Sequence, residues 1–121
     1  MRLLLTISLL CWLACAQAEG ARMLVRSSPL AGSQFYALAE WQGRMQIGDA
    51  LQLIREPENR HDPLAIRVEW QGRKLGYVPR AHNRAVAAAM DAGEPFVARI
   101  SRLKSDPDPW QRLEFEVLLV L

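Results

Sequence analysis

The chain has 121 residues, a formal net charge of +2 and a charged fraction of 23%. A chain of this length supports one domain core rather than two, and a net charge so near zero gives no global argument for binding nucleic acid or an anionic membrane surface. The two cysteines, Cys11 and Cys15, both lie near the N-terminus. The rest of the chain therefore has no disulfide framework, thiol nucleophile or zinc–thiolate site.

Residues 1–18 are predicted to be a secretory signal peptide. Arg2 supplies a positive start, residues 3–16 form an apolar run of suitable length, and Ala16-Gln17-Ala18 is a small-x-small cleavage site. Cleavage after Ala18 leaves residues 19–121, which we expect to be periplasmic or secreted and without stable insertion into the membrane. The alternatives are an uncleaved anchor and a lipoprotein.

Residues 19–27 are interpreted as a mixed lead-in with a short strand at Met23–Val25. Alternating apolar and polar residues then predict further strands, and these fall at 35–41, 51–53, 66–70, 75–77, 96–101 and 113–117. Short alternating segments separated by turn residues are typical of an antiparallel barrel or sandwich.

Turn and helix signals complete this pattern. Trp70-Gln71-Gly72-Arg73 separates two strand patterns by two residues, which predicts a hairpin. The same tetrapeptide at 41–44 is interpreted as a recurrent turn. Residues 84–92 contain five alanines and predict the main helix, with Asn83 as its N-cap and Gly93 as its stop. The predicted fold class is mainly β with one or two short helices, arranged as a small OB-like antiparallel β-barrel.

The densest polar segment is 55–63, which we expect to be a surface loop. Its acidic residues and His61 are potential metal ligands, but their spacing matches no standard ligand loop. His61 and Asp62 are adjacent, which seldom gives a catalytic pair, and no serine lies in a nucleophile-elbow context. Two interpretations of this segment remain open: a loop that contacts a nucleotide and a plain solvated loop. We expect no catalytic residue, metal or cofactor. Elsewhere, we expect Trp41, Trp70 and Trp110 to pack in the core or at the ends of the barrel. We expect His82 to cap the helix or to lie on the surface.

Three motifs in this order resemble the HIRAN domain family. They are Gly-Asp-Ala-Leu-Gln-Leu-Ile-Arg-Glu-Pro at 48–57, Asn-Arg-His-Asp-Pro-Leu-Ala-Ile-Arg-Val at 59–68 and Leu-Gly-Tyr-Val-Pro-Arg at 75–80. The similarity extends over 28–103, and we assign the domain to 28–121. The resemblance implies an OB-type barrel. The DNA-binding members of the family capture the 3′-hydroxyl end of single-stranded DNA, and the resemblance implies the same activity here.

The resemblance further implies a set of ligand-binding residues, namely Phe35, His61, Asp62, Tyr77 and Arg80. Phe35 and His61 would stack on a base, while Asp62 would accept the terminal hydroxyl proton. Arg80 would meet phosphate, and Tyr77 would help at the base or phosphate. Two further residues are expected to shape the loops: Asn59 by bonding nearby backbone, and Gly76 by permitting close approach.

The sequence therefore predicts an exported, monomeric, single-domain binding module without catalytic activity. Its expected partner is single-stranded DNA or a nucleotide-like ligand. The alternative is an envelope protein-interaction module that has lost nucleic-acid binding.

Overall fold

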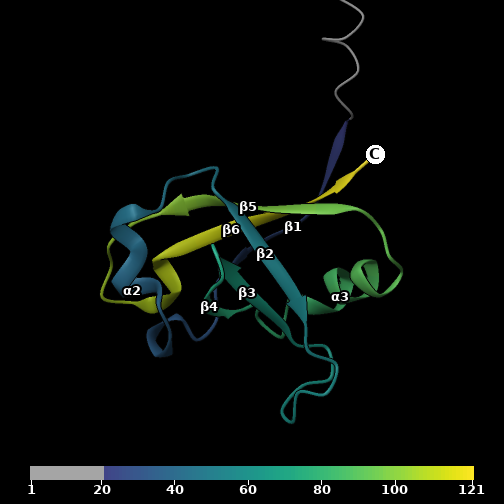
Figure 1. Ribbon diagram of the computed structural model, residues 1–121, viewed down its shortest axis with the longest axis horizontal. Helices are drawn as coiled ribbons and strands as arrows, with labels where there is room; N and C mark the ends of the chain where they lie inside the picture. The colour runs from purple at the N-terminus through teal and green to yellow at the C-terminus, as the bar shows by residue number, and fades with distance from the viewer. Residues whose placement is uncertain (1–20) are drawn as a thin grey trace, which may run out of the picture.

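The computed structural model describes residues 21–121, and the predicted signal peptide lies outside the described residues. Over this range, six strands form one antiparallel sheet in the order β1-β6-β5-β2-β3-β4 (Figure 1). The strands are β1 (Arg22–Pro29), β2 (Ala50–Arg55), β3 (Ile66–Trp70), β4 (Arg73–Tyr77), β5 (Phe96–Leu103) and β6 (Leu113–Val120). The helices are α2 (Leu38–Trp41) and α3 (Asn83–Asp91), with 3-10 turns η1 (Ser33–Phe35), η2 (Gln42–Arg44) and η3 (Pro109–Gln111). The two α-helices lie at opposite ends of the sheet (Figure 1).

The two edges of this sheet meet at one β-bridge. Ala31, just after β1, and Tyr77, at the end of β4, exchange backbone hydrogen bonds of 2.9 Å in both directions. The sheet therefore curls until its outer strands touch, without a continuous closing ladder. The mainly β class is confirmed, and this open barrel is compatible with the predicted OB-like architecture.

The core follows from the alternation of side chains along the strands. Successive residues of a strand point to opposite faces, so every second residue is available for burial. The inward residues of β3 and β6 are at most 4% exposed: Ile66, Val68, Trp70, Leu113, Phe115 and Val117. Burial of this apolar area is the main stabilising term and holds the strands that carry the loops in place.

The β3–β4 hairpin forms as predicted. Gln71 (φ 47°) and Gly72 (φ 79°) both have positive φ, as a two-residue type I′ turn requires. The second copy of the same tetrapeptide, at 41–44, ends α2 and forms η2 instead. The interpretation of a shared, recurrent turn is therefore wrong, because the two copies adopt different conformations in different tertiary surroundings.

The predicted strand over 35–41 is also wrong. Gly32, with φ 73°, turns the chain, and η1 and α2 occupy this stretch. Leu38, which a strand would place on the same face as Glu40, is fully buried, whereas Phe35 is 77% exposed. Leu38 and Trp41 are separated by three residues, so a helical turn brings both toward the core. The apparent period-two pattern conceals a short helical one.

The boundaries of α3 agree with the predicted helix to within one residue at each end. The Gly93 stop is confirmed, since this residue has φ 74° and its N–H donates to the Met90 carbonyl. The predicted Asn83 N-cap is wrong. His82 occupies the capping position without a side-chain capping bond, and the buried Asn83 amide donates to Asp62 instead.

The first strand is longer than predicted. Instead of Met23–Val25 it covers Arg22–Pro29, so part of the expected lead-in belongs to the sheet. Because β1 pairs with β6, the start of the described chain and the C-terminus lie side by side (Figure 1). Among the described residues, no helix combines the length and the hydrophobicity that crossing a membrane requires.

Candidate functional site

A pocket of about 260 Å³ lies where the loop between β2 and β3 meets the end of β4. Three segments that are distant in the sequence supply its walls, around 31–36, 59–65 and 77–80. It contains four of the predicted ligand-binding residues, namely His61, Asp62, Tyr77 and Arg80, together with Asn59. The structure thus brings most of the predicted site together in one concave surface.

Asn59 and Asp62 give the β2–β3 loop its shape. Asn59 Oδ1 accepts the backbone N–H of His61 at 2.9 Å and that of Asp62 at 3.2 Å. Asp62 Oδ1 in turn accepts the backbone N–H of Leu64 at 2.9 Å. Such bonds satisfy backbone donors that no sheet ladder reaches. They hold the Asp62 carboxylate in one orientation at the pocket.

The Asp62 carboxylate is anchored at both oxygens. Oδ2 accepts a 2.8 Å hydrogen bond from Asn83 Nδ2, and Arg80 Nε lies 3.9 Å from the same oxygen. The Leu64 N–H lowers the pKa of Asp62 most; burial works against this, while Asn83, Arg80 and Arg55 lower the pKa further. The net pKa lies below its ordinary value, so the group is ionised at neutral pH. Each oxygen accepts one bond and keeps acceptor capacity for a ligand.

Two predicted residues stand at the mouth of the pocket. The Arg80 side chain is 70% exposed, and its guanidinium donates to the backbone carbonyl of His61. His61 itself is exposed, and within residues 21–121 its ring makes no hydrogen bond. A cationic group and a flat ring are therefore both accessible to a molecule that enters the pocket.

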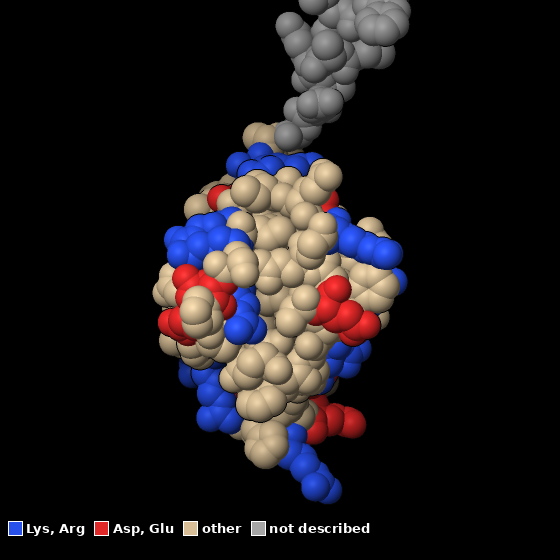
Figure 2. All heavy atoms as spheres, turned by 90° about the vertical axis from the view of Figure 1, so that its left-hand side faces the viewer, with Lys and Arg blue, Asp and Glu red and all other residues tan. Residues whose placement is uncertain are grey.

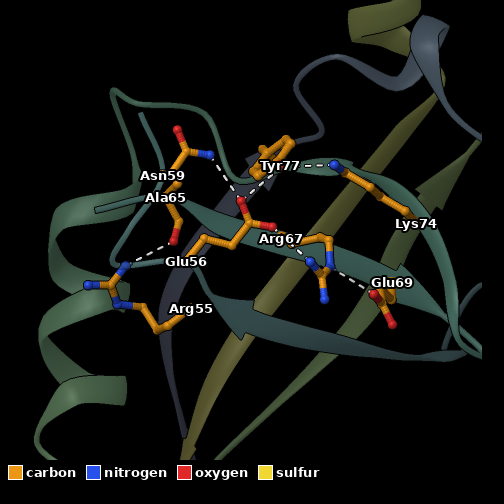
Figure 3. A network of polar contacts seen from close by, with 8 residues as sticks. All are labelled: Arg55, Glu56, Asn59, Ala65, Arg67, Glu69, Lys74 and Tyr77. Atoms are coloured by element: carbon orange, nitrogen blue, oxygen red, sulfur yellow. Dashed lines mark hydrogen bonds and ion pairs between the residues drawn. The ribbon is translucent and has the colours of Figure 1, made fainter. Parts of the chain in front are cut away.

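The hydroxyl of Tyr77 is committed to a polar network behind the pocket (Figure 3). It donates to Glu56 Oε1 at 2.9 Å and accepts from Lys74 Nζ at 2.8 Å. Glu56 Oε1 also accepts from Asn59 Nδ2 at 2.9 Å, and Glu56 Oε2 accepts from Arg67 Nη1 at 2.8 Å. Tyr77 therefore presents its ring to the pocket, while its hydroxyl ties β4 to the loop.

The aromatic wall of the pocket comes from Tyr36 and Tyr77, whose ring centroids are 6.2 Å apart at an interplanar angle of 63°. Lys74 Nζ lies 4.3 Å and 4.6 Å from these two centroids. Phe35, the aromatic expected from this segment, does not line the pocket. The expectation assumed a strand, and the 3-10 turn at this point presents the next residue along the chain instead.

Gly76 allows the two edges of the sheet to come together beside this wall. Its φ is 155°, and a Cβ there would lie 2.3 Å from the Ala31 carbonyl oxygen and 3.1 Å from Leu30 Cγ. No side chain fits in this space. The glycine therefore permits the Ala31–Tyr77 bridge that brings the segment with Tyr36 against β4.

Four residues of the site were not found from the sequence: Tyr36, Glu56, Lys74 and Asn83. Glu56 stands in the conspicuous polar loop, where its residue type indicates a potential metal ligand rather than the centre of a hydrogen-bond network. Asn83 carried a misleading signal, since a polar residue before an alanine-rich run is typical of an N-cap. Tyr36 and Lys74 carried none, because their role depends on which segment faces β4. Residues 21–121 include no group of three or more histidine, cysteine or acidic side chains arranged to hold a metal ion.

Glu56 should make the loop sensitive to acid. Burial raises the pKa of Glu56, but hydrogen bonds from Asn59, Tyr77 and Arg67 and the charge of Arg67 outweigh it, so the net pKa is lowered from its ordinary 4.5. A lowered folded-state pKa gives stability that is complete above the unfolded value and is lost as the pH falls through the folded value. We expect Glu56→Gln to lower the free energy of unfolding at pH 7 by about 1–2 kcal/mol.

Urea denaturation at pH 7 and at pH 3 measures this effect. Below pH 4.5 the difference between Glu56→Gln and the wild type should shrink, because the unfolded wild-type chain takes up a proton at Glu56 before the folded protein does. Glu58→Gln is the matched control, since Glu58 is an exposed carboxylate of the same loop. Equal destabilisation by both substitutions would contradict a specific role for the Glu56 network.

The comparisons with known proteins agree with this architecture. The sequence profile of the HIRAN domain matches residues 25–121. A crystal structure of a protein from Lactobacillus plantarum is 28% identical, with a TM-score of 0.69 over 82% of this chain and 95% of that chain. The crystal structure of the HIRAN domain of human HLTF is 19% identical, with a TM-score of 0.61 over 84% of this chain and 80% of that chain. No curated protein sequence matches the chain. Because the profile spans well over half of its length, this chain belongs to the HIRAN domain family.

Proposed function

We propose that this protein is a binding module without catalytic activity, and that its pocket holds the 3′-hydroxyl end of single-stranded DNA or a similar nucleotide. The observation that carries the proposal is the ionised Asp62 carboxylate, anchored at both oxygens beside the exposed Arg80 guanidinium. The aromatic rings of Tyr36 and Tyr77 complete the pocket.

A terminal nucleotide offers three groups that match these side chains. Its sugar hydroxyl is a donor suited to the carboxylate, and a hydrogen bond to a charged acceptor is stronger than one between neutral groups. Its phosphate suits the guanidinium of Arg80. Its base has a π-face that stacks on aromatic rings, and His61 provides a further ring at the mouth.

The charge distribution supports a local pocket rather than diffuse attraction to DNA. Several arginines are paired with carboxylates, as in Arg55–Asp91, Arg67–Glu56 and Arg99–Glu116. On the face that carries α2, basic and acidic side chains are interspersed around an uncharged stretch (Figure 2). Non-specific binding requires many free cations along the nucleic-acid backbone. A specific end-binding site needs only the few groups of the pocket.

Labelled single strands ending in a 3′-hydroxyl or a 3′-phosphate test the proposal. We expect purified protein to bind the hydroxyl end about tenfold more tightly, because a terminal phosphate would be repelled by Asp62 and has no hydroxyl to donate. The ratio should persist between low and physiological salt. Equal affinity for both ends, with binding that disappears as salt rises, would contradict end capture.

A second candidate, an exported protein-interaction module, is favoured by exposed aromatic residues. Trp110, expected in barrel-end packing, is 48% exposed, and Phe35 is 77% exposed. Their 3-10 turns are joined by the bond from Ser33 Oγ to the Pro109 carbonyl, at 3.5 Å. If neither strand binds even at low salt, this function replaces the first. Export, cleavage after Ala18 and a monomeric state are part of both proposals, and the intact mass of the exported protein tests the cleavage.

A further inference from the structure

A second pocket, of about 370 Å³, lies between β1 and α3 and is termed here the β1–α3 groove. Its polar lining consists of Arg26 from β1, His82 before α3 and Arg84 from the first turn of α3. The remaining lining residues are valine and alanine, and no carboxylate lines it. The groove is therefore cationic with apolar walls.

The two arginines of the groove are not neutralised by the protein. Among the described residues, neither Arg26 nor Arg84 forms an ion pair, unlike Arg55, Arg67 and Arg99. Arg26 Nε is in addition buried without a hydrogen-bond partner. Buried donors in folded proteins are nearly always satisfied, so a donor of this kind indicates an acceptor supplied from outside the chain.

His82 adds a third group whose charge depends on its surroundings. Ser28 Oγ lies 2.9 Å from the Pro29 carbonyl oxygen and 2.9 Å from His82 Nδ1, and the tautomer of the ring sets which atom donates in the second contact. Among the described residues, Nε2 of this ring makes no hydrogen bond. Burial, and after it the charge of Arg26, lower the pKa of His82. A bound anion would oppose both effects and favour the protonated ring.

The groove and the Asp62 pocket share one stretch of chain. Arg80 lines the pocket, whereas His82 and Arg84 line the groove. Asn83, which stands between His82 and Arg84 in the chain, donates a hydrogen bond to the Asp62 carboxylate of the pocket. The pocket and the groove therefore adjoin along residues 80–84, and Arg84 is the next arginine of this segment after Arg80.

We propose that the β1–α3 groove binds a phosphate group. In a single strand held by its 3′ end this would be an internal phosphate, an assignment that rests on the proposed function of the pocket. Two guanidinium groups suit a phosphate group, because each holds its N–H donors in one plane and can bond two phosphate oxygens at once. The positive end of the α3 dipole, at Asn83, adds to the attraction for an anion.

Oligonucleotide length separates the groove from the pocket. A dinucleotide and a hexanucleotide, both with a 3′-hydroxyl, are titrated against wild type, Arg84→Gln and Arg26→Gln. We expect each substitution to weaken hexanucleotide binding about fivefold to tenfold and to leave dinucleotide binding unchanged. The slope of log affinity against log salt should fall by about 0.7 for each substitution. Arg22→Gln removes a charge from β1 outside the groove and should change neither. Arg84 is exposed, so its variant tests the groove even if Arg26→Gln folds poorly.

Inorganic phosphate tests the groove independently of nucleic acid. In NMR spectra near pH 6.5, added phosphate should shift the ring signals of His82 more than those of His61, and the pKa of His82 should rise. Arg84→Gln should reduce this response. A phosphate response without binding of any oligonucleotide supports the groove as a site for free phosphate and counts against the function proposed for the pocket. Oligonucleotide binding that the arginine variants leave unchanged, or a wild type in which phosphate leaves His82 unaffected, overturns the inference.

Discussion

Replacing Gly76 with alanine is expected to lower the free energy of unfolding by about 3 kcal/mol. The added Cβ would lie 2.3 Å from the Ala31 carbonyl oxygen, and backbone atoms cannot give way as a flexible side chain can. The φ of 155° is also one that residues other than glycine rarely adopt. The Ala31–Tyr77 bridge would have to open or shift. Urea denaturation monitored by tryptophan fluorescence measures the change.

Gly43→Ala is the matched control for this substitution. Apart from the adjacent residues of its own turn, no atom lies within 4 Å of a Cβ built at Gly43, and its φ is not positive. We expect a change within about 0.5 kcal/mol, as for other surface substitutions without special features. If both alanine variants had the same stability, the close approach at Gly76 would not be what holds the edges of the sheet together. Because the bridge lies beside the aromatic wall, Gly76→Ala should also weaken ligand binding.

Asp62→Asn is expected to abolish or reverse the preference for a 3′-hydroxyl over a 3′-phosphate. The substitution keeps the size of the side chain and an oxygen that accepts from Leu64, but it removes the negative charge. Loss of a charge-assisted bond to the hydroxyl weakens binding of that end by about tenfold to a hundredfold. Binding of the phosphate end should improve at the same time, because the repulsion is removed. Competition between the two labelled strands measures both effects.

Two further variants define what the Asp62 result means. Asp91→Asn makes the same chemical change at an exposed carboxylate outside the pocket, paired with Arg55, and should leave the end preference intact. Arg80→Gln should weaken both ends alike and reduce the salt dependence, because the proposed partner of Arg80 is phosphate rather than the hydroxyl. An Asp62→Asn protein that melts normally and still prefers the hydroxyl end would rule out Asp62 as the group that selects it.

The strands of the barrel and its hairpin were predictable because their signals are local. Alternation of burial is a property of the extended backbone itself, and the segment 66–70 shows it without interruption. Gly72 marks the hairpin because a two-residue turn needs positive φ. The order and spacing of the three motifs was equally readable, and this was enough to indicate the family.

The pattern of the stretch 35–41 is ambiguous, because seven residues are too few to separate a period of two from a helical turn. What decides its conformation is Gly32, whose positive φ redirects the chain, and the burial of Leu38 in the core. Neither is visible in the local pattern. The consequence for the site is a change of one residue, from Phe35 to Tyr36, at the aromatic wall.

Asn83 is a second residue whose local sequence predicts the wrong role. Its residue type and its place before an alanine-rich helix favour a capping role, yet its amide is drawn to a carboxylate that lies 21 residues earlier in the chain. A buried amide takes the strongest acceptor within reach, and a negatively charged carboxylate is a stronger acceptor than a neutral group. The helix consequently begins without a side-chain cap, and the carboxylate gains its second anchor.

The sequence by itself determined the fold class, the family and the polar loop that Asn59 and Asp62 shape through bonds to nearby backbone, because these depend on neighbouring residues. Only the tertiary structure decided that Tyr36 faces Tyr77, that Asn83 supports Asp62 and that Arg26 lies with Arg84 in one groove. The physical reason is that the walls of both pockets come from segments far apart in the chain. Sheet curvature, allowed by Gly76 and completed at the Ala31–Tyr77 bridge, brings the walls of the Asp62 pocket together.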